Sequence, residues 1–132
     1  MEQERPKINL IAYACARPNL SNAVQFTAIN TFMTARHAEL RTAARFEDTD
    51  IAKRPQLALA LMKAKEPECH GLIVHSLSVL TFQLSHRQTA ELLANFIGPK
   101  ARSLYDLDGK VLPKTILALR NDAIAEIHRD ID

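Results

Sequence analysis

Short apolar runs that alternate with helix-like segments constrain the fold of this chain more than any other feature. Lys7 to Ala14 (KINLIAYA) and Gly71 to His75 (GLIVH) are brief and rich in apolar residues, a pattern that indicates buried strands. Leu40 to Phe46 and Ala101 to Tyr105 are weaker strand candidates. Strands that alternate with helices favour a parallel sheet between layers of helices. We therefore expect a three-layer α/β domain with helices on both faces of a mainly parallel, four- to five-stranded sheet.

Four helical segments separate or follow these runs. Asn19 or Ser21 can cap the first helix, and Arg54-Pro55 opens the second, because proline is tolerated in a first helical turn. The third spans Leu84 to Ile97, and the last runs from Pro113 to the end of the chain. The expected apolar stripes of the first two helices are Leu20, Val24, Ala28, Ile29, Phe32 and Met33, then Leu57, Leu61 and Met62.

Composition limits the class of protein. The chain has 132 residues with a net charge of +2, so we expect one domain over 1–132, and the charge alone does not indicate nucleic acid. No apolar run approaches the roughly 20 residues that cross a bilayer, and the N-terminus lacks the pattern of an export signal. We expect a cytoplasmic protein that makes no membrane contact. Cys15 and Cys69 have no metal-ligand spacing, so we expect neither a metal nor another cofactor.

Ligand sites of parallel α/β sheets lie beyond the carboxyl ends of the strands. That rule selects the segments 13–17, 47–54 and 76–82. The first reads Tyr13-Ala14-Cys15-Ala16-Arg17, the second ends at Arg54-Pro55-Gln56-Leu57, and the third contains Leu77-Ser78-Val79-Leu80-Thr81-Phe82.

In these segments the chain resembles the N-terminal catalytic domain of serine site-specific recombinases (the resolvase/invertase family). That family's first strand ends Tyr-Ala-Arg-Val-Ser, and a Gln about a dozen residues on is matched by Gln25. Its second motif, Arg-Pro-x-Leu, opens a helix, and its third is Leu-Asp-Arg-Leu-x-Arg. The resemblance spans roughly residues 7 to 130. It implies a resolvase-like fold with a C-terminal oligomerisation helix and no helix-turn-helix DNA-binding domain within residues 1–132.

The resemblance also implies an active site whose chemistry has been lost. The family's nucleophile is a serine that attacks a DNA phosphodiester, and Arg17 stands at its position. Arginine has no nucleophilic oxygen and does not lose its proton. Of the family's catalytic arginine positions, only Arg54 retains an arginine. We expect a pseudoenzyme whose degenerate site positions are Tyr13, Cys15, Arg17, Gln25, Arg54, Ser78, Val79 and Phe82.

Three other chemistries use residues of the same segments. Cys15 with a base such as His75 would be a thiol nucleophile, but a buried inert cysteine is the favoured interpretation. Ser76 and Ser78 would be displaced nucleophiles, although loop hydroxyls more often cap backbone groups. Asp48 and Asp50 would form a metal-binding pair, although solvated turn residues explain them better.

Two non-catalytic functions remain. The first is self-association, or association with recombinase-type subunits, through a seam of the last helix formed by Leu117, Ile124, Ile127 and Ile131. The equal alternative for that helix is packing on its own sheet. The second function is weak DNA contact, with Arg17 and Arg54 as the phosphate-binding candidates among scattered arginines.

Overall fold

Within the part of the chain that the structure describes, the strands form one mainly parallel sheet, as expected. The computed structural model describes residues 7–50, 53–99 and 101–131, and their side chains up to residue 129. The sheet order is β2-β1-β3-β4-β5, with the first four strands parallel and β5 antiparallel to β4. The strands are β1 (Ile8–Cys15), β2 (Leu40–Asp48), β3 (Gly71–Ile73), β4 (Ser103–Asp106) and β5 (Gly109–Lys110).

The helices begin where local capping chemistry places them. Ser21 accepts a hydrogen bond from the Val24 backbone N–H at 3.2 Å, and Pro55 occupies the first turn of its helix. Ser85 and Gln88 form a reciprocal capping box, which satisfies N–H groups left free at a helix start. The helices are α1 (Asn22–Ala35), α2 (Pro55–Ala64), α3 (Leu77–Thr81), α4 (His86–Leu93), the 3-10 helix η1 (Ala94–Phe96) and α5 (Pro113–Ile131).

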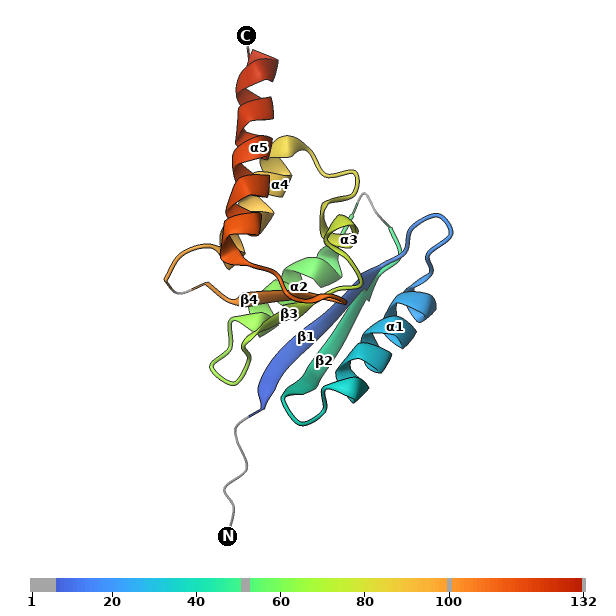
Figure 1. Ribbon diagram of the computed structural model, residues 1–132. Helices are drawn as coiled ribbons and strands as arrows, with labels where there is room; N and C mark the ends of the chain where they lie inside the picture. The colour runs from blue at the N-terminus through green and yellow to red at the C-terminus, as the bar shows by residue number, and fades with distance from the viewer. Residues whose placement is uncertain (1–6, 51–52, 100, 132) are drawn as a thin grey trace.

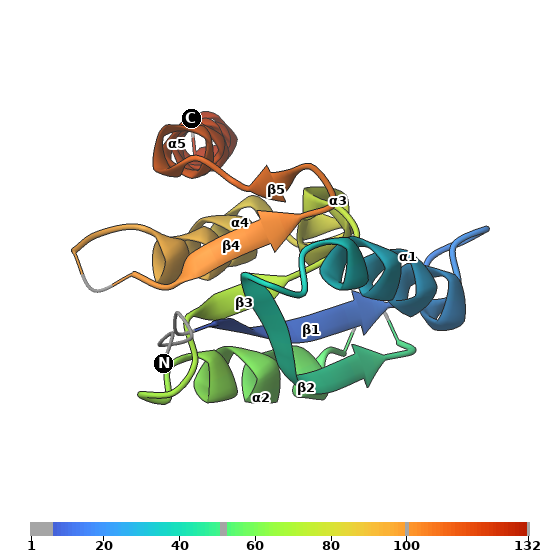
Figure 2. The same cartoon turned by 60° about the horizontal axis from the view of Figure 1, so that its bottom comes forward.

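Helices cover both faces of the sheet, because successive residues of β1 point to opposite sides. Leu10 and Ala12 pack against the buried face of α1. Ile11, Tyr13 and Cys15 belong to the larger core on the other face, which also contains buried residues of α2, α3 and α4. Figure 2 shows α1 and α2 on opposite sides of β1 and β2. The three-layer α/β fold class is therefore confirmed.

Two residues of the expected apolar stripes lie on the surface instead. Val24 is 54% exposed and Met62 is 67% exposed. The buried face of α1 includes Gln25, and the buried face of α2 uses Ala60 and Ala64 beside Leu57. Small side chains let α2 lie close to the sheet, and a glutamine is buried where the ends of the strands supply hydrogen-bond partners. Each stripe assignment was therefore wrong at one position, Val24 or Met62, whereas Ile29, Phe32, Met33 and Leu57 are buried as expected.

The last helix packs against α4, and its later turns project away from the sheet (Figure 1). Its buried residues are Ile116 and Ala123, and Arg120 Nε donates to the Ala90 carbonyl at 3.3 Å. Leu117 stays 44% exposed. Ile124 and Ile127 are half-buried, and the side chain of Ile131 lies outside the described part of the chain. The helix thus packs through a face adjacent to the expected seam. Among the described residues, no helix combines the length and apolar character needed to cross a membrane.

Candidate functional site at the carboxyl ends of the strands

The described residues of the three sequence-selected segments meet at one edge of the sheet. The strand pairing sets Cys15, the last residue of β1, beside Asp48, the last residue of β2. The third segment follows β3, which is the other neighbour of β1. It contains the short helix α3 rather than the loop that the sequence predicted. Parallel strands bring these segments together, as their topology requires.

Asp48 is the centre of the buried part of this edge. It is 5% exposed, and its carboxylate accepts hydrogen bonds from the Tyr13 hydroxyl at 2.7 Å and from the backbone N–H groups of Gln56 and Leu57 at 3.1 and 3.0 Å. A carboxylate at a helix N-terminus accepts hydrogen bonds from free N–H groups and interacts favourably with the helix dipole. The interpretation of Asp48 as a solvated turn residue was wrong, because α2 folds back over the end of β2.

The same contacts affect the phenol of Tyr13. Burial raises the pKa of Tyr13 above its ordinary value, and the hydrogen bond to Asp48 raises it further. The hydroxyl therefore remains protonated and serves as a donor to Asp48. Tyr13 and Asp48 form a fixed pair that joins β1, β2 and the start of α2. Among the described residues, no cluster of three or more His, Cys, Asp or Glu side chains is placed to hold a metal ion.

Arg17 is presented by a tight turn that follows β1. Its backbone pairs with Leu20 through two hydrogen bonds of 3.0 Å. The residues between them are Pro18 and Asn19, and Asn19 has a φ of 64°, which suits asparagine in a turn. The guanidinium lies 4.3 Å from the centre of the Phe82 ring, and its Nη1 donates to Ser78 Oγ at 2.5 Å. The turn thus directs Arg17 onto α3 and the residue after it.

Arg54 also reaches α3, from the other side. Its Nη1 donates to the carbonyls of Val79 and Leu80 at 2.9 and 2.8 Å, and its Nη2 donates to the carbonyl of Phe82. Arg54 is the residue directly before α2. Arg54, which the sequence resemblance equates with a catalytic arginine, is therefore engaged with backbone oxygens of its own chain.

The remaining candidate residues are buried or face α3. Gln25 is fully buried, and its Nε2 donates to the carbonyls of Cys15 and Leu20 at 2.7 and 3.2 Å. Cys15 and Val79 are fully buried. Ser78 is exposed, and its Oγ lies 2.9 Å from Ser76 Oγ. The structure brings all eight candidate positions to this edge, together with Asp48, whose capping role the sequence reasoning missed. A carboxylate six residues before an Arg-Pro helix start was the available signal.

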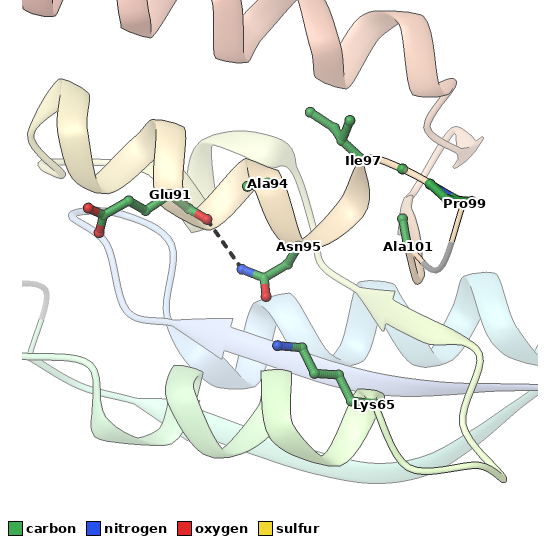
Figure 3. A pocket seen from close by; sticks show the side chains of 8 residues that line it. Lys65, Glu91, Ala94, Asn95, Ile97, Pro99 and Ala101 are labelled. Carbon is green, nitrogen blue, oxygen red and sulfur yellow. Dashed lines mark hydrogen bonds between the residues drawn. The ribbon is translucent and has the colours of Figure 1, made fainter.

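A separate pocket lies at the opposite edge of the sheet. It encloses about 490 Å³ between the end of α2 and the segment α4–η1 (Figure 3). Lys65, Glu91 and Asn95 are its polar lining residues, and the Asn95 amide donates to the Glu91 carbonyl at 3.4 Å and to the Leu92 carbonyl at 2.9 Å. The two charged side chains are of opposite sign, and none of the degenerate site positions lines this pocket.

Comparison with known proteins identifies the fold. No family model matches the sequence, and no curated protein sequence matches it. Among solved structures, the N-terminal catalytic domain of TP901-1 integrase matches with a TM-score of 0.70 at 14% sequence identity. The match covers 93% of this chain and 98% of that domain. The fold is therefore that of a serine recombinase catalytic domain. At this identity the likeness concerns the fold alone.

Proposed function

We propose that this chain is a recombinase-like protein that does not cleave DNA and acts by associating with a second copy or with recombinase-type subunits. Arg17 is the observation that carries this proposal. It follows β1 at the place where the recombinase family has its nucleophilic serine, and its guanidinium is directed onto Ser78 and Phe82. A guanidinium supplies no nucleophile.

The loss of charge-stabilising groups supports the same proposal. Phosphoryl chemistry of the family type needs several guanidiniums around the reacting phosphate, and removing one such donor typically costs about 100- to 1000-fold in rate. Here Cys15 and Val79 stand at two of those positions and are fully buried. Burial of Cys15 also argues against an altered chemistry that uses its thiol, because a reactive thiol must be accessible to its substrate.

The surface of α5 favours association. Leu117 and Leu119 are 44% and 38% exposed on a helix whose later turns extend beyond α4 (Figure 1). Ile124 and Ile127 are half-buried on the same helix. Burial of such side chains against a second helix stabilises a complex by about 25 cal/mol for each Å² of apolar surface removed from water. The resemblance to recombinases suggests the same helix, since that family uses its long C-terminal helix for dimer contacts.

Weak DNA contact is the second candidate function. It is favoured by Arg17, which is half-buried and lies beside the hydroxyl of Ser78. Arg54 supports it less, because its guanidinium binds carbonyls of α3. Fluorescence anisotropy of a labelled duplex across a salt series tests this function. Binding that weakens steeply with salt and is lost in Arg17→Ala would favour it, and no binding at low salt would exclude it.

Sedimentation velocity over a concentration series tests association, with Leu117→Glu as the disrupting variant. Leu59→Glu is the matched control, because Leu59 is 46% exposed on α2. We expect the wild type to associate, alone or with a serine recombinase catalytic domain. Leu117→Glu should weaken that association at least tenfold, and Leu59→Glu should leave it unchanged. A wild type that remains monomeric in both experiments at high micromolar concentration would refute the proposal.

A further inference from the structure

We propose that Arg54 is a positioning residue that latches the end of α3 onto the start of α2. This contact would thereby fix the position of α4 and α5 relative to the sheet. The inference rests on the proposed function only in its last step, in which α5 is the association surface. It gives a role to a side chain that the recombinase resemblance marks as a relic of catalysis.

The carbonyl groups at the end of α3 show why a latch is needed. A helix of five residues leaves most of its last carbonyls without an intrahelical donor. The carbonyl of Ser78 accepts from the Phe82 N–H at 2.9 Å, and that of Thr81 accepts from the Leu84 N–H at 3.1 Å. The carbonyls of Val79, Leu80 and Phe82 accept from Arg54.

Burial makes the contacts to Val79 and Leu80 important for α3. Val79 and Leu80 have no exposed surface, so water does not readily replace the guanidinium as a donor to their carbonyls. An unsatisfied buried carbonyl is unfavourable. The planar guanidinium presents several N–H groups in a fixed geometry, which lets one side chain serve three acceptors within four residues of chain. No other single side chain has this combination of donor number and shape.

The backbone next to Arg54 is fixed by its own contacts. Arg54 directly precedes α2, where Pro55 restricts the backbone. The next two residues, Gln56 and Leu57, donate their backbone N–H groups to the buried carboxylate of Asp48. Arg54 therefore extends from a fixed point of the fold toward a helix too short to be stable alone.

The consequence extends to the distal helices. After Phe82 the chain passes through Gln83, which has a φ of 60°, and then enters the capping box that starts α4. Figure 1 shows this connection leading from α3 to α4, against which α5 packs. Since the end of α3 is the starting point of this path, fixing it restricts the position of α4. In the proposed function, that restriction pre-orders the association surface on α5.

Hydrogen exchange followed by mass spectrometry tests the latch on the full chain at low micromolar concentration. The variants are Arg54→Gln and Arg54→Lys. Arg102→Gln is the matched control, because Arg102 Nη2 donates in the same way to the carbonyls of Lys65 and Glu66 after α2 and does not contact α3. We expect Arg54→Gln to raise the exchange rate of residues 77–84 at least tenfold while β1 stays protected. Arg102→Gln should leave residues 77–84 unchanged.

The outcomes separate the latch from a general role in stability. If Arg54→Gln lowers protection in β1 as well, Arg54→Lys decides, and we expect it to expose residues 77–84 selectively and to a smaller extent. If Arg54→Gln is folded and its residues 77–84 exchange within twofold of the wild-type rate, the inference is overturned. If Arg54→Gln is not folded, the same result for Arg54→Lys overturns it. Sedimentation velocity of the same variants measures their association and is a separate test. A monomeric wild type would refute the association function and leave the exchange result on α3 standing.

Discussion

The two halves of the candidate site differ in burial and in the number of contacts that each residue makes. Tyr13 and Asp48 are buried, and the Asp48 carboxylate accepts hydrogen bonds from three donors in two segments of the chain. Ser78 is exposed and Arg17 is half-buried, and one hydrogen bond and one ring contact hold the arginine. The buried half joins two strands and a helix, whereas the more exposed half contributes fewer contacts to the fold.

This difference bears on the proposed function, in which a recombinase-like fold persists without recombinase chemistry. Substitutions at exposed positions usually change stability by less than about 0.5 kcal/mol, whereas loss of a buried hydrogen-bonded group costs several times more. An exposed group of the site, such as Ser78, can therefore be replaced while the fold persists. Replacing Tyr13 or Asp48, in contrast, is expected to lower the free energy of unfolding substantially.

Asp48→Ala is expected to have the largest effect. It leaves the Tyr13 hydroxyl and two helix N–H groups without their acceptor, and each buried group left unsatisfied costs about 1 to 3 kcal/mol. We expect the free energy of unfolding in urea to fall by about 3 kcal/mol in total.

Glu47→Ala is the control for this variant, because Glu47 is the exposed neighbour of Asp48 in β2. Its free energy of unfolding should stay within about 0.5 kcal/mol of the wild type. Equal effects of the two variants would show that the buried half of the site is no more important for stability than the exposed half.

Tyr13→Phe is expected to have an intermediate effect that depends on pH. It removes the donor to Asp48 Oδ2, which still accepts from the Leu57 N–H, so the loss at neutral pH is about 1 kcal/mol. Because burial raises the pKa of Tyr13 above 10.0, only the unfolded chain loses this proton just above pH 10. Between pH 9 and pH 11 the wild type should then lose about 1.4 kcal/mol more stability in total than Tyr13→Phe. Parallel pH profiles of the two proteins from pH 9 to 11 would contradict the assignment.

Arg17→Ser is expected to have the smallest effect. It places a serine at the position that our proposal equates with the family's nucleophile, and it removes one hydrogen bond and one ring contact. We expect a stability loss of about 0.5 kcal/mol or less. A supercoiled-plasmid nicking assay should detect no cleavage and no covalent protein–DNA product, because the other charge-stabilising positions remain replaced. Cleavage by Arg17→Ser would show that the exposed half of the site needs only its nucleophile.

Much of the fold was predictable because its signals are local. The apolar run of β1, the cap at Ser21 and the proline that opens α2 each depend on residues close in sequence, and the structure places all three elements as expected. The short helix α3 was missed, because five residues have too little helical periodicity to distinguish them from a loop. The two-residue strand β5 was missed, because it depends on pairing with β4.

The sequence by itself determined the order of the elements and which three segments meet at one edge, because alternating strands and helices permit few parallel topologies. It also led us to expect that a serine and several arginines are absent from the family's catalytic positions. Only the tertiary structure decided where the side chains go. Asp48 is buried because α2 folds over it, and Arg54 meets carbonyls 25 to 28 residues away in sequence. These partners come together only when the chain has folded, so no local pattern specifies them.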